Sequence, residues 1–265
     1  MWWTAVILGV VEGLTEFLPI SSTGHLIVAG HLLGFTGEIA DTFEIVIQLG
    51  AILAVIFYYR QKITQLVVHS ASDANARRLL LGLGLAFLPA AVVGLLTHRW
   101  ITAYLFNTAT VAGALIGGGV LILVIERVHP PIRTRSLEST TWRQALGIGM
   151  AQCAALFPGV SRSGATIMGG LLAGMDRTTA TEYSFFLAIP TMIAATLYDM
   201  LKHITLFTRH DFALLAVGFA VSFFVALVVI HGLLSYVKRH TFDLFAYYRI
   251  AAGLLAFAWL WSGGP

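Results

Sequence analysis

Long apolar runs, separated by short polar turns, dominate the chain. A helix needs roughly 20 apolar residues to cross about 30 Å of hydrocarbon. Pro89 and Pro190 lie inside two of the runs, which membrane helices tolerate when neighbouring groups satisfy the freed carbonyls. Gly113 and Gly117 form a small-xxx-small pair, at which we expect another helix to approach closely. The pattern predicts six membrane-spanning helices at roughly 41–59, 79–97, 101–125, 179–201, 212–237 and 244–262.

Two further apolar regions are interrupted and do not read as spans. Residues 2–35 are broken by "LPISSTG", and residues 143–174 by "FPGVSRSG". After the first break, "HLIVAGHLLGF" offers only half a bilayer, about 16 Å of helix. The broken regions therefore predict two re-entrant helix–loop–helix hairpins, whose irregular backbone must face protein or water and not lipid.

Composition agrees with an all-α integral membrane protein. The 265 residues are 58% hydrophobic and 11% charged, against about 25% charged in soluble domains. A net charge of +3 could suggest nucleic-acid binding, but the basic residues lie in short loops and form no basic-aromatic patch. The first residues carry neither a basic segment nor a cleavage site, so we expect no removed signal peptide. We expect the bilayer as a partner and no nucleic acid.

Lys and Arg predict the orientation, because cytoplasmic loops are enriched in them. The two loops on the other side hold only Arg99 in one, and Lys202 and Arg209 in the other. Arg249, inside the last span, is expected to snorkel to the inner interface. Both chain ends are thus expected outside, with the first hairpin entering from the outer face and the second from the inner face. The loops expected in the cytoplasm carry Arg60, Lys62, Arg77, Arg78, Arg127, Arg133, Arg135, Arg143, Lys238 and Arg239.

A weak internal repeat appears when the sequence is shifted by 140 positions. Ser21-Ser22-Thr23-Gly24 then lies over Ser161-Arg162-Ser163-Gly164. Three full spans, an odd number, separate the two hairpins, so the halves must insert with opposite topology. We expect a single membrane domain, 1–265, with repeat halves at approximately 1–126 and 140–265. Its two hairpin tips would meet near mid-membrane, walled off from lipid.

The first tip carries a glutamate pair. Glu12 and Glu16 have i, i+4 spacing, which places both carboxylates on one helix face about 6 Å apart. Two such carboxylates in a low-dielectric site cannot both stay ionised without a cation. A divalent cation, Mg²⁺ or Ca²⁺, would solve this through oxygen ligands. The alternative is that one glutamate is protonated and bonds to backbone. Glu44 and Gln48 share a helix face and are expected to border the site.

The segment "SSTGH" adds hydroxyls and an imidazole. Its amides lie at a helix N-terminus, which suits an anion. Ser22 is three residues from His25, so either Ser22 is a nucleophile with His25 as its base, or His25 itself attacks phosphorus. The alternative is that the hydroxyls only cap the helix. His31 is expected to be structural.

At the second tip, Arg162 is costly at mid-membrane depth unless an anion meets it, and its guanidinium suits phosphate. The alternative partner is a glutamate of the first hairpin, and substrate can join that pair. The expected catalytic set is Glu16, Ser22, His25 and Arg162. The groups expected to bind phosphate are Ser21, Thr23, Gly24, Ser161, Ser163, Gly164 and Thr166.

Two long segments carry a family resemblance. "GVVEGLTEFLPISSTGHL" and "ALFPGVSRSGATI" closely resemble the two signature segments of the bacterial undecaprenyl-pyrophosphate phosphatases, the bacitracin-resistance family. The similarity extends to "TFEIVIQLGAILAV" and "SFFLAIP". The resemblance implies an inverted-repeat fold, a divalent cation and hydrolysis of undecaprenyl diphosphate in the bacterial plasma membrane. By motif position it also implies roles for Glu12, Glu16, the Ser22-Thr23-His25 group and Arg162.

The resemblance further implies a polyprenyl diphosphate substrate, whose tail stays in lipid. The charge bias favours a pocket that opens to the extracytoplasmic side, and the sequence leaves homo-oligomerisation open. Broken helices and midplane polar sites are also marks of secondary transporters. A transporter or lipid flippase with a midplane anion site is therefore the alternative function, although a transporter needs no nucleophile.

Overall fold

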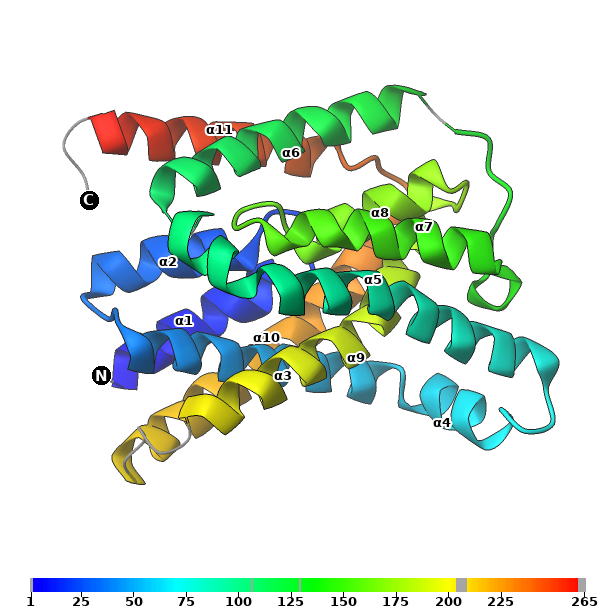
Figure 1. Ribbon diagram of the computed structural model, residues 1–265, viewed down its shortest axis with the longest axis horizontal. Helices are drawn as coiled ribbons and strands as arrows, with labels where there is room; N and C mark the ends of the chain where they lie inside the picture. Colours follow the sequence, from blue (N-terminus) through cyan, green and yellow to red (C-terminus); the bar gives the residue numbers. More distant parts are fainter. Residues whose placement is uncertain (1, 106, 129, 204–208, 262–265) are drawn as a thin grey trace.

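A computed structural model describes residues 2–105, 107–128, 130–203 and 209–261 (Figure 1). Within these ranges the regular elements are helical, apart from one isolated bridge between Thr134 and Met175. The all-α prediction is therefore confirmed. In chain order the elements are α1 (Trp2–Thr15), α2 (Ser22–Leu33), α3 (Glu38–Tyr58), α4 (Arg60–Val68), α5 (Ala74–Leu105), α6 (Thr108–Val128), η1 (Leu137–Ser139), α7 (Trp142–Cys153), η2 (Ala154–Leu156), α8 (Arg162–Leu172), α9 (Arg177–His203), α10 (Arg209–Val237) and α11 (Asp243–Trp261).

Several of these helices are long and apolar enough to cross a membrane. In the described ranges five qualify alone, and a sixth span arises if α3 and α4, bent by 73° between Tyr58 and Arg60, count as one. No more than half of any of the five windows is buried, which leaves apolar faces for lipid. The five stretches are Ala74–Thr97, Thr108–Val128, Arg177–Tyr198, Phe212–Val237 and Asp243–Trp261.

The predicted spans overlap these helices, but some boundaries were wrong. Helix α5 continues to Leu105, so the expected helix start at residue 101 lies inside α5, and the next helix begins at Thr108. The apolar run beyond Thr97 simply continues the helix. Residue 262, the expected end of the last span, lies outside the described residues, as do the side chains of Lys202 and Arg209.

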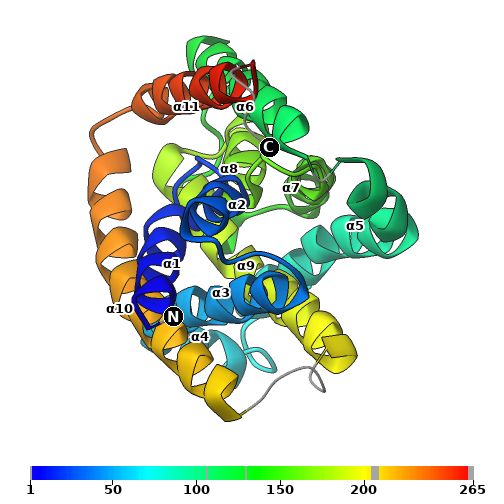
Figure 2. The same ribbon diagram turned by 90° about the vertical axis from the view of Figure 1, so that its left-hand side faces the viewer.

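Two pairs of shorter helices are set among the longer ones. Helix α1, at 14 residues, spans about 21 Å and is shorter than a typical bilayer crossing. It packs against α2, and α7 packs against α8. In Figure 1 the pair α1–α2 lies toward the end that carries the N-terminus, whereas α7 begins at the opposite end. Viewed end-on, α2 and α8 lie near the centre, with longer helices around them (Figure 2).

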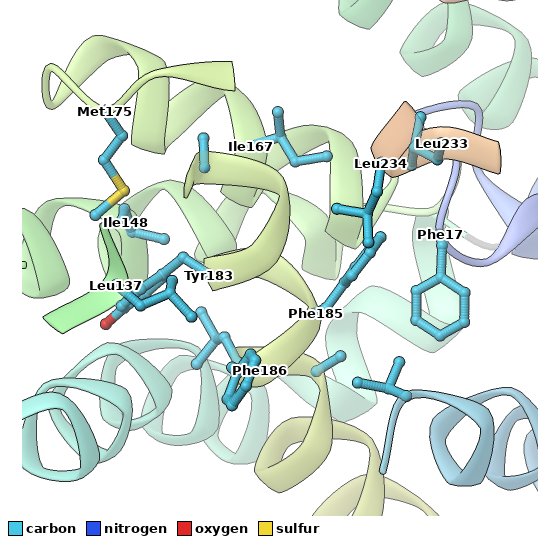
Figure 3. Packing of buried hydrophobic residues seen from close by; sticks show 14 of the residues in the cluster. Phe17, Leu137, Ile148, Ile167, Met175, Tyr183, Phe185, Phe186, Leu233 and Leu234 are labelled. Carbon is cyan, nitrogen blue, oxygen red and sulfur yellow. The ribbon is translucent and has the colours of Figure 1, made fainter. Parts of the chain in front are cut away.

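Helix α9 contributes several of the largest side chains to the main apolar core (Figure 3). Tyr183, Phe185 and Phe186 on this helix are all essentially buried, and they pack with Ile167 of α8. Phe17, from the loop after α1, meets Phe185 edge-on with ring centroids 5.1 Å apart. Aromatic pairs in this geometry contribute about 0.5–1.5 kcal/mol beyond their burial. The core thus fixes the first loop against α9, the helix that follows α8.

Helices α6 and α11 pack closely through glycine, but not through the expected pair. A Cβ at Gly119 would lie 2.7 Å from Ile250 Cγ1 and 2.8 Å from the carbonyl oxygen of Ala246. By contrast, no described atom lies within 4 Å of a Cβ built at Gly113 or Gly117, so the close approach expected there was wrong. The two expected glycines face outward because the helix turns its other face toward α11.

This contact predicts the effect of adding one methyl group. Gly119→Ala should lower the free energy of unfolding by about 1–3 kcal/mol, because backbone on α11 must move. The matched control Gly113→Ala should be neutral or slightly stabilising, because alanine favours helix and meets open space. Thermal unfolding of the two purified variants in detergent tests this. Equal midpoints for the two variants would contradict the packing.

Candidate active site

The two loops that break α1–α2 and α7–α8 end in the same way. Ser21 and Ser161 precede α2 and α8 with φ of 74° and 73°, and they are the non-glycine residues with positive φ in the described chain. Each serine caps its helix, because Ser21 Oγ accepts from the amide of Gly24 and Ser161 Oγ from that of Gly164. Such backbone strain costs on the order of 1–3 kcal/mol and often marks functional sites.

Arg249 of α11 joins the two loops, and its predicted snorkelling to the interface was wrong. The side chain is fully buried. All five guanidinium N–H groups find carbonyl oxygens at 3.0–3.3 Å. A Cβ at Gly118 would collide with the guanidinium. The acceptors are Pro19 in the first loop, Gly159 and Val160 in the second, and Ala114 and Leu115 on α6.

Glu16, Ser22 and Arg162 come together where the loops meet. Arg162 Nη2 donates to Glu16 Oε1 at 3.0 Å, and Ser22 Oγ donates to Glu16 Oε2 at 2.5 Å. Arg162 Nη1 also donates to the carbonyl of Ser184 on α9, at 3.0 Å. Glu16 is thus the partner of Arg162, which was the alternative to an anion in the sequence-based expectation. Glu16 therefore connects a hydroxyl and a guanidinium across the two hairpins.

His25 lies on α2, but its ring contacts other groups. Its Nδ1 lies 2.7 Å from the carbonyl oxygen of Ser21, so this nitrogen carries the proton. Its Nε2 lies 2.6 Å from the hydroxyl of Tyr248, and the two rings stack with centroids 5.6 Å apart. Among the described contacts, no hydrogen bond joins His25 to Ser22. Sequence reasoning missed Tyr248, although a phenol within an apolar helix beside Arg249 was a signal.

Of the residues expected to bind phosphate, some make structural hydrogen bonds and others line a cavity. Ser163 donates to the carbonyl of Leu18, and Thr166 donates to Ser184 Oγ, so both hydroxyls fasten helix α8 to its neighbours. The amides of Gly24 and Gly164 are used by the serine caps. The tip residues that line the adjoining cavity are Glu16, Ser21, Ser22, Thr23, Ser161 and Arg162.

That cavity has a volume of about 560 Å³. Gln48 borders it, as expected, and two polar residues that sequence reasoning missed also line it. These are Gln152 on α7 and Thr191 on α9, with Thr191 Oγ1 3.4 Å from Gln152 Oε1. The other walls are largely apolar and come from α5, α9 and the second loop. A polar base with apolar walls fits an amphiphilic ligand.

Glu12 tests whether the site fits a cation. Its side chain is fully buried on α1, and within the described structure neither carboxylate oxygen has a hydrogen-bond partner. The charged residues close to it are Glu16, Glu44 and Arg162. The described residues contain no group of three or more His, Cys, Asp or Glu placed to hold a metal. Mg²⁺ commonly uses one or two carboxylates together with substrate phosphates, so the orphaned oxygens of Glu12 beside Glu16 fit such a group.

Comparison with known proteins assigns the chain to a family. A sequence model described as "Bacitracin resistance protein BacA" matches residues 5–255. The chain belongs to the bacitracin resistance protein family. The chain is similar to "Undecaprenyl-diphosphatase 2" of Rhodospirillum rubrum, at 55% identity over 98% of this chain and 95% of that protein.

Further family members are similar over a comparable length. The "Undecaprenyl-diphosphatase" of Methylobacillus flagellatus is 52% identical over 97% of both chains. That of Ectopseudomonas mendocina is 51% identical over 97% of this chain and 94% of its own. These relatives are bacterial, and the similarity covers nearly the whole of this family member.

The guanidinium bridge predicts a strict requirement for arginine at position 249. Arg249→Lys keeps the charge, but an ammonium has three donors and cannot reach five carbonyls. We expect a loss of about 3–5 kcal/mol in the free energy of unfolding, or failure to accumulate folded protein, because buried acceptors lose their partners. Thermal unfolding in detergent measures it, with Arg239→Lys as the exposed control. A wild-type midpoint for Arg249→Lys would contradict the bridge.

Proposed function

We propose that this protein hydrolyses undecaprenyl diphosphate to undecaprenyl phosphate and inorganic phosphate, which recycles the lipid carrier of cell-wall synthesis. One observation carries the proposal: Glu16 holds both the Ser22 hydroxyl and the Arg162 guanidinium at the wall of a cavity with apolar sides. The names of relatives at 51–55% identity agree with it.

The membrane arrangement we propose has six spans and two re-entrant hairpins in an inverted-topology repeat, with halves at approximately 1–126 and 140–265. The matching caps of Ser21 and Ser161 support it, as does the approach of α1–α2 and α7 from opposite ends of the molecule (Figure 1). We place the protein in the bacterial plasma membrane. The basic loops before α5 and α7 would lie in the cytoplasm, and the cavity would open to the other side.

For the reaction, Ser22 is the favoured nucleophile. Its hydroxyl already donates to Glu16, whereas both ring nitrogens of His25 have other partners. Ser22 Oγ would bond to the terminal phosphorus while the bond from that phosphorus to the bridging oxygen breaks. The bridging oxygen leaves with the electron pair as undecaprenyl phosphate, and the Ser22 proton passes to Glu16 Oε2. Glu16 returns the proton to Ser22 Oγ when water cleaves the phosphoserine.

Charge stabilisation dominates phosphoryl transfer, and this chain supplies it at several points. Arg162 would bind phosphate oxygens, since its Nε is buried without a partner in the described structure. Thr23 and Ser161, at the cavity wall, would donate further hydrogen bonds to the phosphates. A divalent cation held by Glu12 and Glu16 would supply neutralisation of phosphate charge when bound. His25, held by Tyr248, would position the start of α2. The C55 tail would leave the cavity along its apolar wall into lipid.

A lipid flippase or secondary transporter is the second candidate. Its support is the pair of broken helices and the polar cavity between them, features of transporter binding sites. A transporter binds and releases its cargo and needs no hydroxyl placed against a carboxylate. The contact between Ser22 and Glu16 therefore favours hydrolysis.

Substitutions at the tips should separate catalytic from structural residues. Ser22→Ala, Arg162→Ala and His25→Ala should each lower phosphate release from undecaprenyl or farnesyl diphosphate, Ser22→Ala by at least about 10³-fold. The matched control His31→Ala should keep wild-type activity, because His31 is exposed and does not line the cavity. Circular dichroism checks that each variant is folded. Rapid quenching with labelled terminal phosphate should trap phosphoserine at position 22, whereas phosphohistidine would transfer the role to His25.

Removal of divalent cations should stop the reaction. Purified protein treated with EDTA should release no phosphate, and Mg²⁺ or Ca²⁺ should restore release, because the diphosphate charge then loses its counter-ion. Undiminished phosphate release in EDTA would refute the cation. Wild-type protein that releases no phosphate yet moves lipid across liposomes would establish the flippase instead.

A further inference from the structure

A second and larger cavity, of about 980 Å³, lies at the other end of the molecule. It shares no lining residue with the cavity at the loop tips. Its walls come from the start of α5, the segment before α7, the start of α7 and the end of α8. In Figure 1 the starts of α5 and α7 lie at the end opposite the chain termini. This cavity plays no part in the reaction proposed above.

Four arginines line the second cavity, and no aspartate or glutamate does. They are Arg77, Arg78, Arg133 and Arg143. None of the four forms an ion pair among the described residues. Arg78 is held by a hydrogen bond from its Nε to the carbonyl of Thr140. The Cζ atom of Arg143 lies over the ring of Trp142, 5.3 Å from the ring centroid. Uncompensated charge in a concave site concentrates the electric field, so the cavity attracts an anion.

The cavity also has a rigid polar base. Gln144 lines it and donates from Nε2 to Thr134 Oγ1 and to the carbonyl of Ala173, at 2.9 and 3.0 Å. It completes a capping box with Thr141 at the start of α7. These bonds tie the segment before α7 to the end of α8. The backbone segments that carry the arginines are therefore held in place by hydrogen bonds.

Apolar side chains at the same cavity decide what kind of anion fits. Leu81, Trp142 and Leu172 line it and are 68%, 61% and 57% exposed. A free phosphate gains nothing from such groups, whereas the acyl chains of a phospholipid do. Tryptophan is enriched where membrane meets water, and basic pockets between membrane helices bind anionic head groups. We propose that this cavity binds the head group of an anionic phospholipid, such as phosphatidylglycerol or cardiolipin, with its acyl chains along the leucines.

The test measures lipid binding by the purified full chain. Native mass spectrometry in detergent would compare phosphatidylglycerol and cardiolipin with phosphatidylcholine of the same acyl chains. The test variant is Arg77→Gln/Arg143→Gln, because both side chains are exposed and neither ties the frame together. The matched control is Arg135→Gln, which removes a nearby exposed charge outside the cavity. Thermal midpoints without lipid check that both variants are folded.

The proposal predicts tighter binding of the anionic lipids than of phosphatidylcholine by wild-type protein. Each arginine near a membrane surface contributes about 1 kcal/mol, or about fivefold, so the double variant should bind anionic lipid about 25-fold more weakly. Arg135→Gln should stay within about twofold of wild type, because a charge outside the cavity gives little. Equal affinity for the three lipids, or unchanged affinity in the double variant, would overturn the proposal. A third outcome would also overturn the proposal: inorganic phosphate stabilises the wild-type protein but not the double variant, and the anionic lipids fail to bind. The occupant would then be the free anion.

Discussion

The structure depends on one buried guanidinium. A chain that breaks its helices inside an apolar layer leaves carbonyl groups without water or helical partners, and each such group costs several kcal/mol. Arg249 answers this need for both loops at once, because its planar group presents five donors in fixed directions. A buried charge is expensive by itself, yet here every donor is satisfied. With the backbone of the two loops held at a common centre, Glu16 and Arg162 can meet from opposite hairpins.

The polar residues at that centre form a connected set and not a collection of separate contacts. Glu16 touches Ser22 and Arg162, and Arg162 also reaches Ser184 on α9, the helix that carries the apolar core. In the proposed reaction, a diphosphate that enters the cavity would compete with Glu16 for the Arg162 guanidinium and would join an existing ion pair. Glu12 lies one helical turn before Glu16, and within the described structure its carboxylate oxygens have no hydrogen-bond partner. Because these contacts connect both loops and α9, they would hold the groups of the proposed reaction in fixed positions, which reduces reorganisation.

Much of this arrangement follows from sequence periodicity and from single costly residues. Continuous apolar runs predicted the long helices, and the interruptions at Pro19 and Pro158 marked the two loops, because length and polarity are local properties. The pairing of Glu16 with Arg162 could also be anticipated from the sequence, because a charge in a membrane needs a partner. The contacts of Arg249 and Tyr248 could not be predicted from the sequence. The sequence of α11 is that of an ordinary span, and only the folded chain brings its polar side chains to Pro19 and His25. The glycine contact on α6 was misplaced because spacing alone does not say which helix face meets a neighbour.

The long sequence separation between Arg249 and the first loop has a consequence for biosynthesis. Pro19, whose carbonyl it binds, precedes it by 230 residues. At a translation rate of about 5–20 residues per second, the first loop waits roughly 10–45 s on the ribosome before its donor is made. During that interval its carbonyls must be satisfied by water or by the insertion machinery. The two loops are thus joined only after α11 is made, and a nascent chain that stalls before α11 carries Glu16, Ser22 and Arg162 without the guanidinium that holds the loops together.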